Sequence, residues 1–307
     1  MPAHTYEFIQ LDVFTQTPLS GNPLAIFPDG RGLNDAEMQA LAREMNLSET
    51  TFILPRDAAT EAREGKKVRI FTVETELPFA GHPTLGTALF LYASESNSKK
   101  SAEITLDLKA GKVPVRFTAN SENGGCDRVD GQVFGEMRQR DPEFGTAFSR
   151  EEVARVIGIA VNEISPEWPI QPVSTGLTFT IVPFRNRQTL SDLKFSYAQA
   201  SEFLKSSGAN FFYFLCPERR EGHLEARARM FFYGGEDPAT GSAAGCAASW
   251  MVQHGVAKND EQVLIRQGAE CRRPSEMYVR ATREGERVTN VRVGGYAVEI
   301  LRGTVVL

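Results

Sequence analysis

Two segments of this chain, residues 84–93 and 240–254, have the composition of helices but lack a polar face. Small and apolar residues occur all round each segment, so neither helix can leave one side in water. Such a helix has to be buried on every side, and a sheet that curls around it provides that environment. One of these segments lies in each half of the chain, which predicts two halves of similar construction.

The rest of each half consists mainly of short runs of apolar and β-favouring residues, which predict strands. The strands expected in the first half are residues 6–14, 24–27, 52–54, 68–71, 102–108 and 113–118. Those expected in the second half are residues 178–182, 211–215, 226–232, 263–266, 277–281, 288–293 and 297–306. Further helices are expected after Asn34 and Ser149, because each is a preferred N-cap residue with a glutamate three positions later.

The chain has 307 residues, which exceeds the usual size of one compact core and favours two domains. Residues 119–131 are polar and contain glycine, as is typical of a domain boundary. The predicted domains are residues 1–120 and 121–296, with the last strand, about residues 297–307, returning to the first domain. The predicted fold class is α/β (α+β), with two pseudo-symmetric barrel-like domains, each a curled sheet around a central helix.

A short internal repeat supports duplication. The pattern Pro-x-x-Gly-[Thr/Ser]-Ala occurs at residues 83–88 and again at residues 238–243. Both copies lie at the break before the buried helix of their half, which makes a chance match less probable than the common residues alone would suggest. This alignment places Pro83 opposite Pro238.

Charge and cysteine content exclude several classes of protein. The formal net charge is −5 and no basic block occurs, which argues against nucleic acid as a partner. No apolar stretch approaches the roughly 20 residues that span a bilayer, and no signal peptide is recognisable. The four cysteines are widely spread without a CxxC pair, which favours a reducing cytoplasm and indicates no thiolate metal site.

The starts of the two buried helices are candidate anion sites. A helix N-terminus carries free backbone N–H groups and a partial positive charge, and glycines nearby let a ligand approach the backbone. Two such starts would offer donors to one small carboxylate. The alternative is that the glycines only allow the helices to pack tightly, and on the residues alone both interpretations stand.

Three side chains near these segments are candidates for chemistry. His82 and Asp237 each precede a proline, which is favoured at the first helical position, so each could be an N-cap. Aspartate is a preferred N-cap but histidine is not, and the His82 imidazole could instead orient or protonate a substrate near neutral pH. Glu49 follows a helix and precedes an apolar strand, so it has no capping role, and from spacing alone a merely exposed carboxylate is the simpler interpretation.

Several longer motifs together are much more specific. They are Asp12-Val13-Phe14 with Gly21-Asn22-Pro23, residues 42–52 (AREMNLSETTF), residues 77–83 (LPFAGHP), residues 236–245 (EDPATGSAAG) and Arg302-Gly303-Thr304. In these motifs the chain resembles the phenazine-biosynthesis PhzF family, within the diaminopimelate-epimerase-like fold, nearly from end to end.

The resemblance implies two similar barrel-like α/β halves, each wrapped on a central helix, with the active site between them. It also implies a homodimer without a metal or an organic cofactor. The implied function is that of a cofactor-independent isomerase. It would move a proton on a small cyclic or amino-acid-like carboxylate such as trans-2,3-dihydro-3-hydroxyanthranilate.

The resemblance also assigns residues to roles. It makes Glu49 the general acid and base, with His82 and Asp237 as further catalytic residues. The implied substrate-binding residues are Asn22, Ser48, Gly81, Thr240, Gly241 and Ser242. It pairs Ala80-Gly81-His82 with Thr240-Gly241-Ser242, a register different from the one that pairs Pro83 with Pro238.

Two other functions remain as alternatives. Related epimerases use two cysteines, whose positions correspond to Ala80 and Thr240 in this chain. Since neither residue is a thiol, racemisation or epimerisation by the two-thiol route is not favoured. The other alternative is a non-catalytic protein that binds a small molecule or a partner on the same scaffold.

Overall fold

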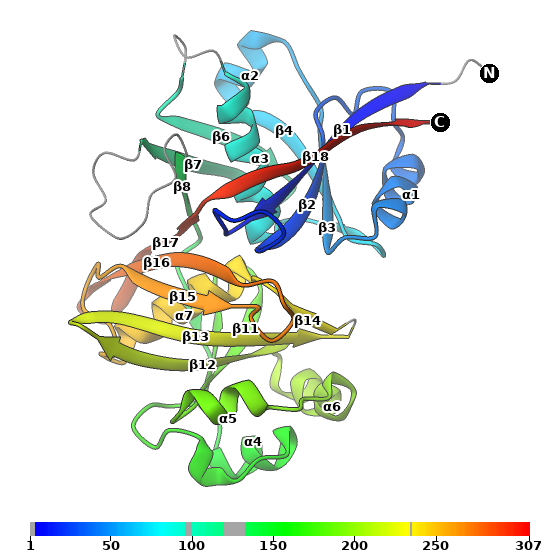
Figure 1. The fold of residues 1–307 in the computed structure, drawn as a ribbon. Coiled ribbons are helices and arrows are strands. Elements are labelled where there is room, and N and C mark those ends of the chain that lie inside the picture. The colour runs from blue at the N-terminus through cyan, green and yellow to red at the C-terminus, as the bar shows by residue number, and fades with distance from the viewer. Residues whose placement is uncertain (1–3, 96–99, 120–132, 234) are drawn as a thin grey trace. The chain divides into compact units, whose positions relative to one another are not determined.

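The computed structural model describes residues 4–95, 100–119, 133–233 and 235–307 (Figure 1). Contacts between residues divide the chain into two compact units. Unit 1 comprises residues 1–138 together with residues 294–307, and unit 2 comprises residues 139–293. The predicted boundary at residues 119–131 lies, after its first residue, outside the described part of the chain.

In the sheet of unit 1, two pairs of neighbouring strands run parallel. One pair is connected by a helix on the surface, and the other is connected by a buried helix. Its strands are β1 (Thr5–Val13), β2 (Asn22–Phe27), β3 (Glu49–Ile53), β4 (Lys66–Phe71), β5 (Glu76–Leu77), β6 (Glu103–Leu108), β7 (Gly111–Ala119), β8 (Val133–Arg138) and β18 (Ala297–Val306). β18 pairs antiparallel with β1 and β1 with β2, while β2 and β3 run parallel. β4 pairs antiparallel with β3 and β5 and parallel with β6, and β7 pairs antiparallel with both β6 and β8.

The central helix of unit 1 is α3 (Gly81–Ser94), and the sheet surrounds it. Residues 81–89 of α3 are all buried, and the helix contacts β1, β2, β3, β6, β7 and β8. Gly86 allows α3 to approach β1 closely, because a Cβ there would lie 2.6 Å from Val13 Cγ2. The predicted helix without a polar face is therefore confirmed, and it begins three residues earlier than expected.

Two other helices, α1 (Asp35–Met45) and α2 (Ala58–Glu64), complete unit 1. The predicted cap of α1 is confirmed, since the Asn34 side chain accepts from Glu37 N–H and the Glu37 side chain accepts from Asn34 N–H. Met38 and Leu41 turn inward from α1 and join Phe27, Phe52 and Phe71 in one apolar cluster.

Unit 2 has a corresponding sheet. Its strands are β9 (Glu143–Phe144), β10 (Gln171–Ser174), β11 (Thr178–Pro183), β12 (Phe211–Arg220), β13 (His223–Phe232), β14 (Gly235–Asp237), β15 (Val263–Gln267) and β16 (Ser275–Glu284). The next strand, β17 (Arg287–Gly295), begins in unit 2 and ends in unit 1. β10 pairs antiparallel with β9 and β11, and β11 runs parallel to β12. β13 pairs antiparallel with β12 and β14 and parallel with β15, which pairs antiparallel with β16.

The central helix of unit 2 is α7 (Gly241–Gln253), which is buried along its length and contacts β10, β11, β12 and β16. Three further α-helices, α4 (Arg150–Ile157), α5 (Arg187–Asp192) and α6 (Tyr197–Ser207), with the short 3-10 helix η2 (Val161–Glu163), gather on the opposite side of the sheet (Figure 1). An apolar cluster that includes Val153, Leu204 and Phe214 joins them to β12.

The two units follow the same order of strand pairing, which supports duplication. β4, β5 and α3 of unit 1 correspond to β13, β14 and α7 of unit 2. The two helices start at Gly81 and Gly241, so the register that pairs Ala80 with Thr240 matches the structure. The repeat that pairs Pro83 with Pro238 is wrong, because Pro83 lies inside α3 whereas Pro238 precedes α7.

Candidate active site

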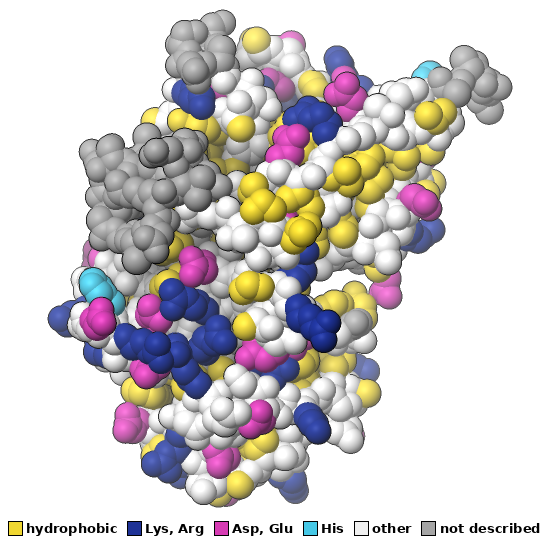
Figure 2. Space-filling view, viewed as in Figure 1, with side chains coloured by type: hydrophobic (Ala, Val, Ile, Leu, Met, Phe, Trp, Pro, Cys, Tyr) yellow, Lys and Arg dark blue, Asp and Glu magenta, His cyan; other side chains and the backbone are white. Residues whose placement is uncertain are grey.

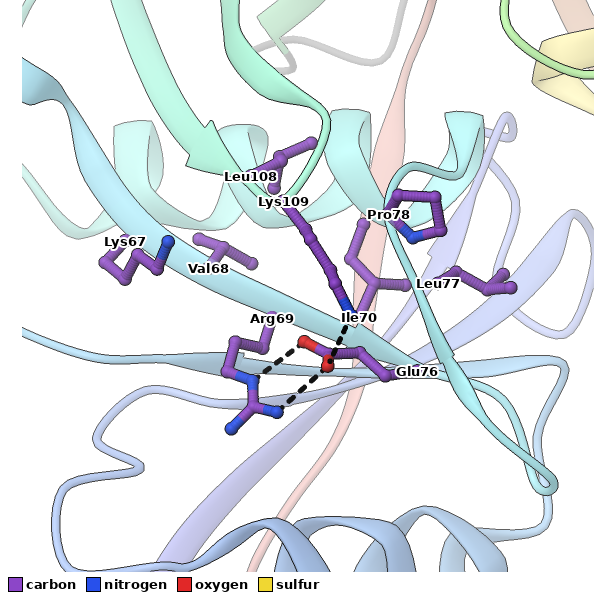
Figure 3. Close-up of a pocket in the computed structure, with 9 residues that line it drawn as sticks. All are labelled: Lys67, Val68, Arg69, Ile70, Glu76, Leu77, Pro78, Leu108 and Lys109. Carbon is purple, nitrogen blue, oxygen red and sulfur yellow. Dashed lines mark hydrogen bonds and ion pairs between the residues drawn. The ribbon is translucent and has the colours of Figure 1, made fainter.

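The chain enters α3 from a short hairpin, β4–β5, that a charged pair closes. Arg69 makes a bidentate contact with Glu76, with Nε–Oε1 and Nη2–Oε2 distances of 2.8 and 3.0 Å (Figure 3). These hydrogen bonds hold the pKa of the Glu76 carboxyl below its usual value. The pair thereby fixes the chain just before the turn that leads to Gly81.

A small cavity of about 150 Å³ lies beside this pair and is lined by residues 67–70, 76–78, 108 and 109 (Figure 3). Its cations already have carboxylate partners. Lys109 Nζ lies 3.4 Å from Glu76 Oε2, and Lys67 Nζ lies 3.6 Å from Asp107 Oδ2. Because these charges are neutralised within unit 1, the cavity is not a good site for an anionic substrate.

Unit 2 repeats the charged pair in a more buried form. Arg229 Nε and Nη2 both lie 2.8 Å from the Glu236 carboxylate, and Arg229 Nη1 also donates to the carbonyls of Leu190, Ser191 and Leu193. Arg229 is 6% exposed. The pair fixes the hairpin β13–β14 that leads into α7 and ties it to the end of α5.

Glu49 and His82 lie together in unit 1. Glu49 is the first residue of β3, opposite Leu24 of the parallel strand β2, and His82 is the second residue of α3. The distance from His82 Nδ1 to Glu49 Oε2 is 3.4 Å, and the two side chains are 5% and 16% exposed. A hydrogen bond of 3.0 Å between the hydroxyls of Thr51 and Thr87 ties β3 to α3 close to this pair.

Burial decides the charge of His82. It lowers the pKa of the imidazole to about 3, and the Pro23 carbonyl, which favours the protonated ring, only partly opposes this. The ring is therefore neutral at pH 7, which does not favour the predicted role as a proton donor and leaves the predicted role in orienting a substrate. Its Nε2 atom is buried and makes no hydrogen bond to the described residues, so it is available to a ligand.

Two other predicted residues of unit 1 lie beside these elements. Asn22 is the first residue of β2 and is fully buried, next to the Pro23 carbonyl that faces His82. Ser48 is half-buried in the turn directly before Glu49. The turn before Asn22 requires glycine, since Gly21 has a φ of +68°.

The two central helices differ from the others at their N-termini. The N-cap residues Ala80 of α3 and Thr240 of α7 make no side-chain capping hydrogen bond. The other described α-helices all have one, from Asn34, Asp57, Ser149, Asn186 and Ser196. The first-turn amides of α3 and α7, at Gly81 and Gly241, are therefore left for another acceptor. The predicted N-cap alternative for His82 and Asp237 is wrong, because His82 lies inside α3 and Asp237 lies in β14.

Asp237 and Thr240 lie together in unit 2. The Thr240 hydroxyl donates to Asp237 Oδ2 at 2.6 Å. Thr240 is 6% exposed and Asp237 is 9% exposed. Gly241 and Ser242 follow as the first two residues of α7, with Ser242 half-buried. The structure thus groups the predicted residues in two sets, one in each unit.

Gln267 belongs to the second set, although the sequence does not single it out. It is 1% exposed at the end of β15, and its amide contacts both Asp237 and Thr240. A single glutamine at the end of an ordinary strand carries no motif, so only its position in the fold reveals it.

The cysteines provide no thiolate at either helix start. Ala80 and Thr240 occupy those positions. The free thiols among the described residues are Cys216, Cys246 and Cys271. Cys126 lies outside that part of the chain. Burial raises the pKa of both Cys246 and Cys271 to about 11, so both are protonated thiols at neutral pH.

The part of the chain that the structure describes contains no group of three or more His, Cys, Asp or Glu side chains that could hold a metal ion. Within the same residues, no helix has both the length and the apolar character needed to cross a membrane.

The largest group of basic side chains in Figure 2 lies among acidic ones. On the outer face of the unit 2 sheet, Arg266 pairs with Glu225 and Glu276, and Arg187 pairs with Glu218. A surface with both signs interleaved does not form the concentrated positive stripe that phosphate backbones require.

Comparison with known proteins identifies similar chains over the full length. The model of the PhzC-PhzF family, described as phenazine biosynthesis-like protein, matches residues 11–303. The trans-2,3-dihydro-3-hydroxyanthranilate isomerase of Pseudomonas chlororaphis is 36% identical, over 98% of this chain and 100% of that protein.

Solved structures confirm the fold class. A PhzF-family phenazine biosynthesis protein of Bacillus anthracis superposes with a TM-score of 0.83 at 28% identity, covering 99% of this chain and 100% of that one. A hydroxyproline epimerase of Agrobacterium vitis gives a TM-score of 0.64 at 13% identity, covering 100% and 93% of the two chains, and shows likeness of fold alone. The predicted diaminopimelate-epimerase-like α/β fold is therefore confirmed.

Proposed function

Since this chain belongs to the PhzC-PhzF family of phenazine biosynthesis-like proteins and is an isomerase, we propose that it moves a proton within a small carboxylate substrate, with Glu49 as acid and base. The observation that carries the proposal is the contact between Glu49 and His82. A largely buried carboxyl lies 3.4 Å from an imidazole that burial keeps neutral.

In the proposed reaction, the Glu49 carboxylate removes a proton from a carbon atom of the substrate. The electron pair of the broken C–H bond moves into the substrate, and the protonated Glu49 then returns the proton to a different carbon of the same molecule. No proton is gained or lost overall, so the reaction is an isomerisation. A general acid and base of this kind contributes roughly 10²–10⁴-fold to rate.

His82 supports both stages without changing its charge. In the tautomer with hydrogen on Nδ1, which lies 3.4 Å from Glu49 Oε2 and beside the Pro23 carbonyl, the ring presents Nε2 to the substrate as an acceptor. A neutral ring adds no positive charge beside Glu49, and it leaves the proton transfer to the carboxyl group.

The remaining residues are proposed to hold the substrate. The amides at the starts of α3 and α7 and the Ser242 hydroxyl bind its carboxylate. Asp237 accepts from its amine or hydroxyl. The full set of proposed substrate-binding residues is Asn22, Ser48, Gly81, Thr240, Gly241 and Ser242.

We propose trans-2,3-dihydro-3-hydroxyanthranilate as the first substrate to test, because a relative 36% identical over its full length carries that activity in its name. Another small cyclic or amino-acid-like carboxylate is the proposed class if this molecule is not converted. We also propose that the chain acts as a homodimer, and sedimentation as a monomer at micromolar concentration would contradict that.

The test is conversion of this substrate in deuterated water. Product is followed by absorbance, and deuterium at the newly formed C–H bond is followed by mass spectrometry. The wild type should form product, Glu49→Gln should lose most of the rate, and Glu44→Gln, on the exposed face of α1, should behave as the wild type. Rapid turnover by a folded Glu49→Gln variant would exclude the role of Glu49. Binding without product or exchange would favour the non-catalytic alternative.

A further inference from the structure

The Gln267 amide makes four hydrogen bonds, which connect it to Asp237, Thr240 and Tyr213. Its Nε2 donates to the Asp237 carbonyl at 2.7 Å and to Thr240 Oγ1 at 2.9 Å. Its Oε1 accepts from the Tyr213 hydroxyl at 3.1 Å and from the Thr240 backbone N–H at 3.4 Å. All four residues are buried, so these bonds are not exchanged for bonds to water.

Two backbone groups determine which way the Gln267 amide faces. The Thr240 N–H can only donate, so it must face Oε1, and the Asp237 carbonyl can only accept, so it must face Nε2. Exchange of the amide oxygen and nitrogen would break both bonds. Burial raises the pKa of Tyr213 well above its ordinary value, so its hydroxyl remains protonated and donates to Oε1.

The direction of the next bond follows from this orientation. Thr240 Oγ1 accepts a hydrogen from Gln267 Nε2, and therefore uses its own single hydrogen for Asp237 Oδ2 at 2.6 Å. Asp237 Oδ2 is therefore the acceptor in this bond.

These hydrogen bonds require the end of β15 to lie close to the turn before α7, and a glycine allows this approach. Gly268, directly after Gln267, has a φ of +82°, and a Cβ there would lie 2.5 Å from the Pro238 carbonyl oxygen. A side chain at this position would separate the end of β15 from the turn that holds Asp237.

Unit 1 shows that the fold itself does not require these bonds. In the equivalent hairpin, Leu77 pairs with Ile70 as Asp237 pairs with Met230, and Ala80 stands at the N-cap where α7 has Thr240. The helix α3 starts in the same way without either polar side chain. The bonds in unit 2 are therefore an addition to the shared scaffold.

We propose that Gln267 is a positioning residue that, through the Thr240 hydroxyl, holds Asp237 as an acceptor aimed at an N–H or O–H group of the substrate. This inference rests on the proposed function. It narrows the substrate class to small carboxylates that also carry an amine, ammonium or hydroxyl group.

The direction of the bonds can be tested without any substrate, by neutron diffraction on crystals exchanged into deuterated water. The map should show the Thr240 deuterium pointing to Asp237 Oδ2 and the Tyr213 deuterium pointing to Gln267 Oε1. A deuterium on Asp237 Oδ2, or a Thr240 deuterium that points to Gln267, would overturn the inference even if the enzyme is active.

The positioning role is tested by kinetics with trans-2,3-dihydro-3-hydroxyanthranilate. Thr240→Val removes the hydrogen bond to the Asp237 carboxylate and should lower kcat/KM by roughly 10- to 100-fold, the range for a lost hydrogen bond to a charged group. Gln267→Met, which acts through the Thr240 hydroxyl, should also lower kcat/KM, by up to the same factor. Thr240→Ser should restore the rate, because it keeps the hydroxyl. The double variant should be no worse than either single one, since both act on Asp237. Gln171→Met, a half-buried glutamine of the same unit, is the matched control.

The outcomes separate this inference from the proposed function. If Gln267→Met or, where that variant does not fold, Thr240→Val keeps the wild-type kcat/KM while Glu49→Gln loses activity, the positioning role is wrong and the role of Glu49 stands. If Glu49→Gln remains active, the proposed function fails. The neutron map then still decides whether Asp237 is held as an acceptor.

Discussion

His82 Nδ1 lies 3.4 Å from Glu49 Oε2, and the imidazole in this contact is neutral. The pair therefore differs from an ion pair of a carboxylate with an imidazolium, in which each charge would stabilise the other. A neutral ring lies against the carboxyl group without attracting a negative charge as a cation would. Such a partner suits a group that has to take up and release a proton in each turnover.

Replacement of Glu49 is expected to remove most of the activity. Glu49→Gln keeps the size of the side chain but cannot accept a proton from carbon, so kcat should fall by ~10²–10⁴-fold with an unchanged circular dichroism spectrum. Steady-state kinetics with trans-2,3-dihydro-3-hydroxyanthranilate measure this loss of kcat. Glu44→Gln should retain the wild-type kcat, and an equal loss in both variants would point to a general effect of removing charge.

His82 should make the stability of the protein depend on pH. Its pKa is about 3 in the folded state and near 6.5 when unfolded, so between these values the unfolded state binds the additional proton. Stability should therefore fall as the pH is lowered from 6.5 toward 3, by about 2 kcal/mol at pH 5 for this residue.

Urea unfolding of the wild type and of His82→Gln at pH 7 and pH 5 measures this contribution. The loss of unfolding free energy between the two pH values should be smaller in the variant by about that amount. The exposed His223→Gln serves as the control and should leave the difference between the two pH values as in the wild type. Equal pH dependence in the wild type and His82→Gln would show that His82 is not buried in its neutral form.

The two arginine–glutamate pairs should differ in their contribution to stability. Glu236→Gln leaves the Arg229 side chain, 8% exposed, without its carboxylate and should cost roughly 3 kcal/mol. Glu76→Gln affects Arg69, which is 19% exposed and also contacts Asp35, and should cost only about 1 kcal/mol. Denaturant unfolding of both variants compares them, and equal losses would contradict the role assigned to burial.

Thiol chemistry is not expected to contribute to the reaction. Because burial raises the pKa of Cys246 and Cys271 to about 11, neither is a thiolate at neutral pH. Cys246→Ala and Cys271→Ser should keep the wild-type kcat, and both thiols should react slowly with iodoacetamide at pH 7. A large loss of kcat in either folded variant would contradict this prediction and would favour a mechanism that uses thiols.

The sequence by itself determined those features that depend on near neighbours in the chain. The absence of a polar face on residues 84–93 and 240–254 predicts two buried helices, and α3 and α7 are such helices. The capping pair Asn34 and Glu37 is likewise readable from its spacing. The long motifs predict the family, because many residues have to match at once.

Only the tertiary structure decided which distant residues meet and how far water is excluded from them. His82 and Glu49 are far apart in sequence and become neighbours because β3 packs against α3. Burial then sets the charge of His82, and a pKa depends on surroundings that spacing does not describe. Gln267 illustrates the same limit. Its side chain meets Asp237 and Thr240 only after the parallel strands β13 and β15 have brought them together.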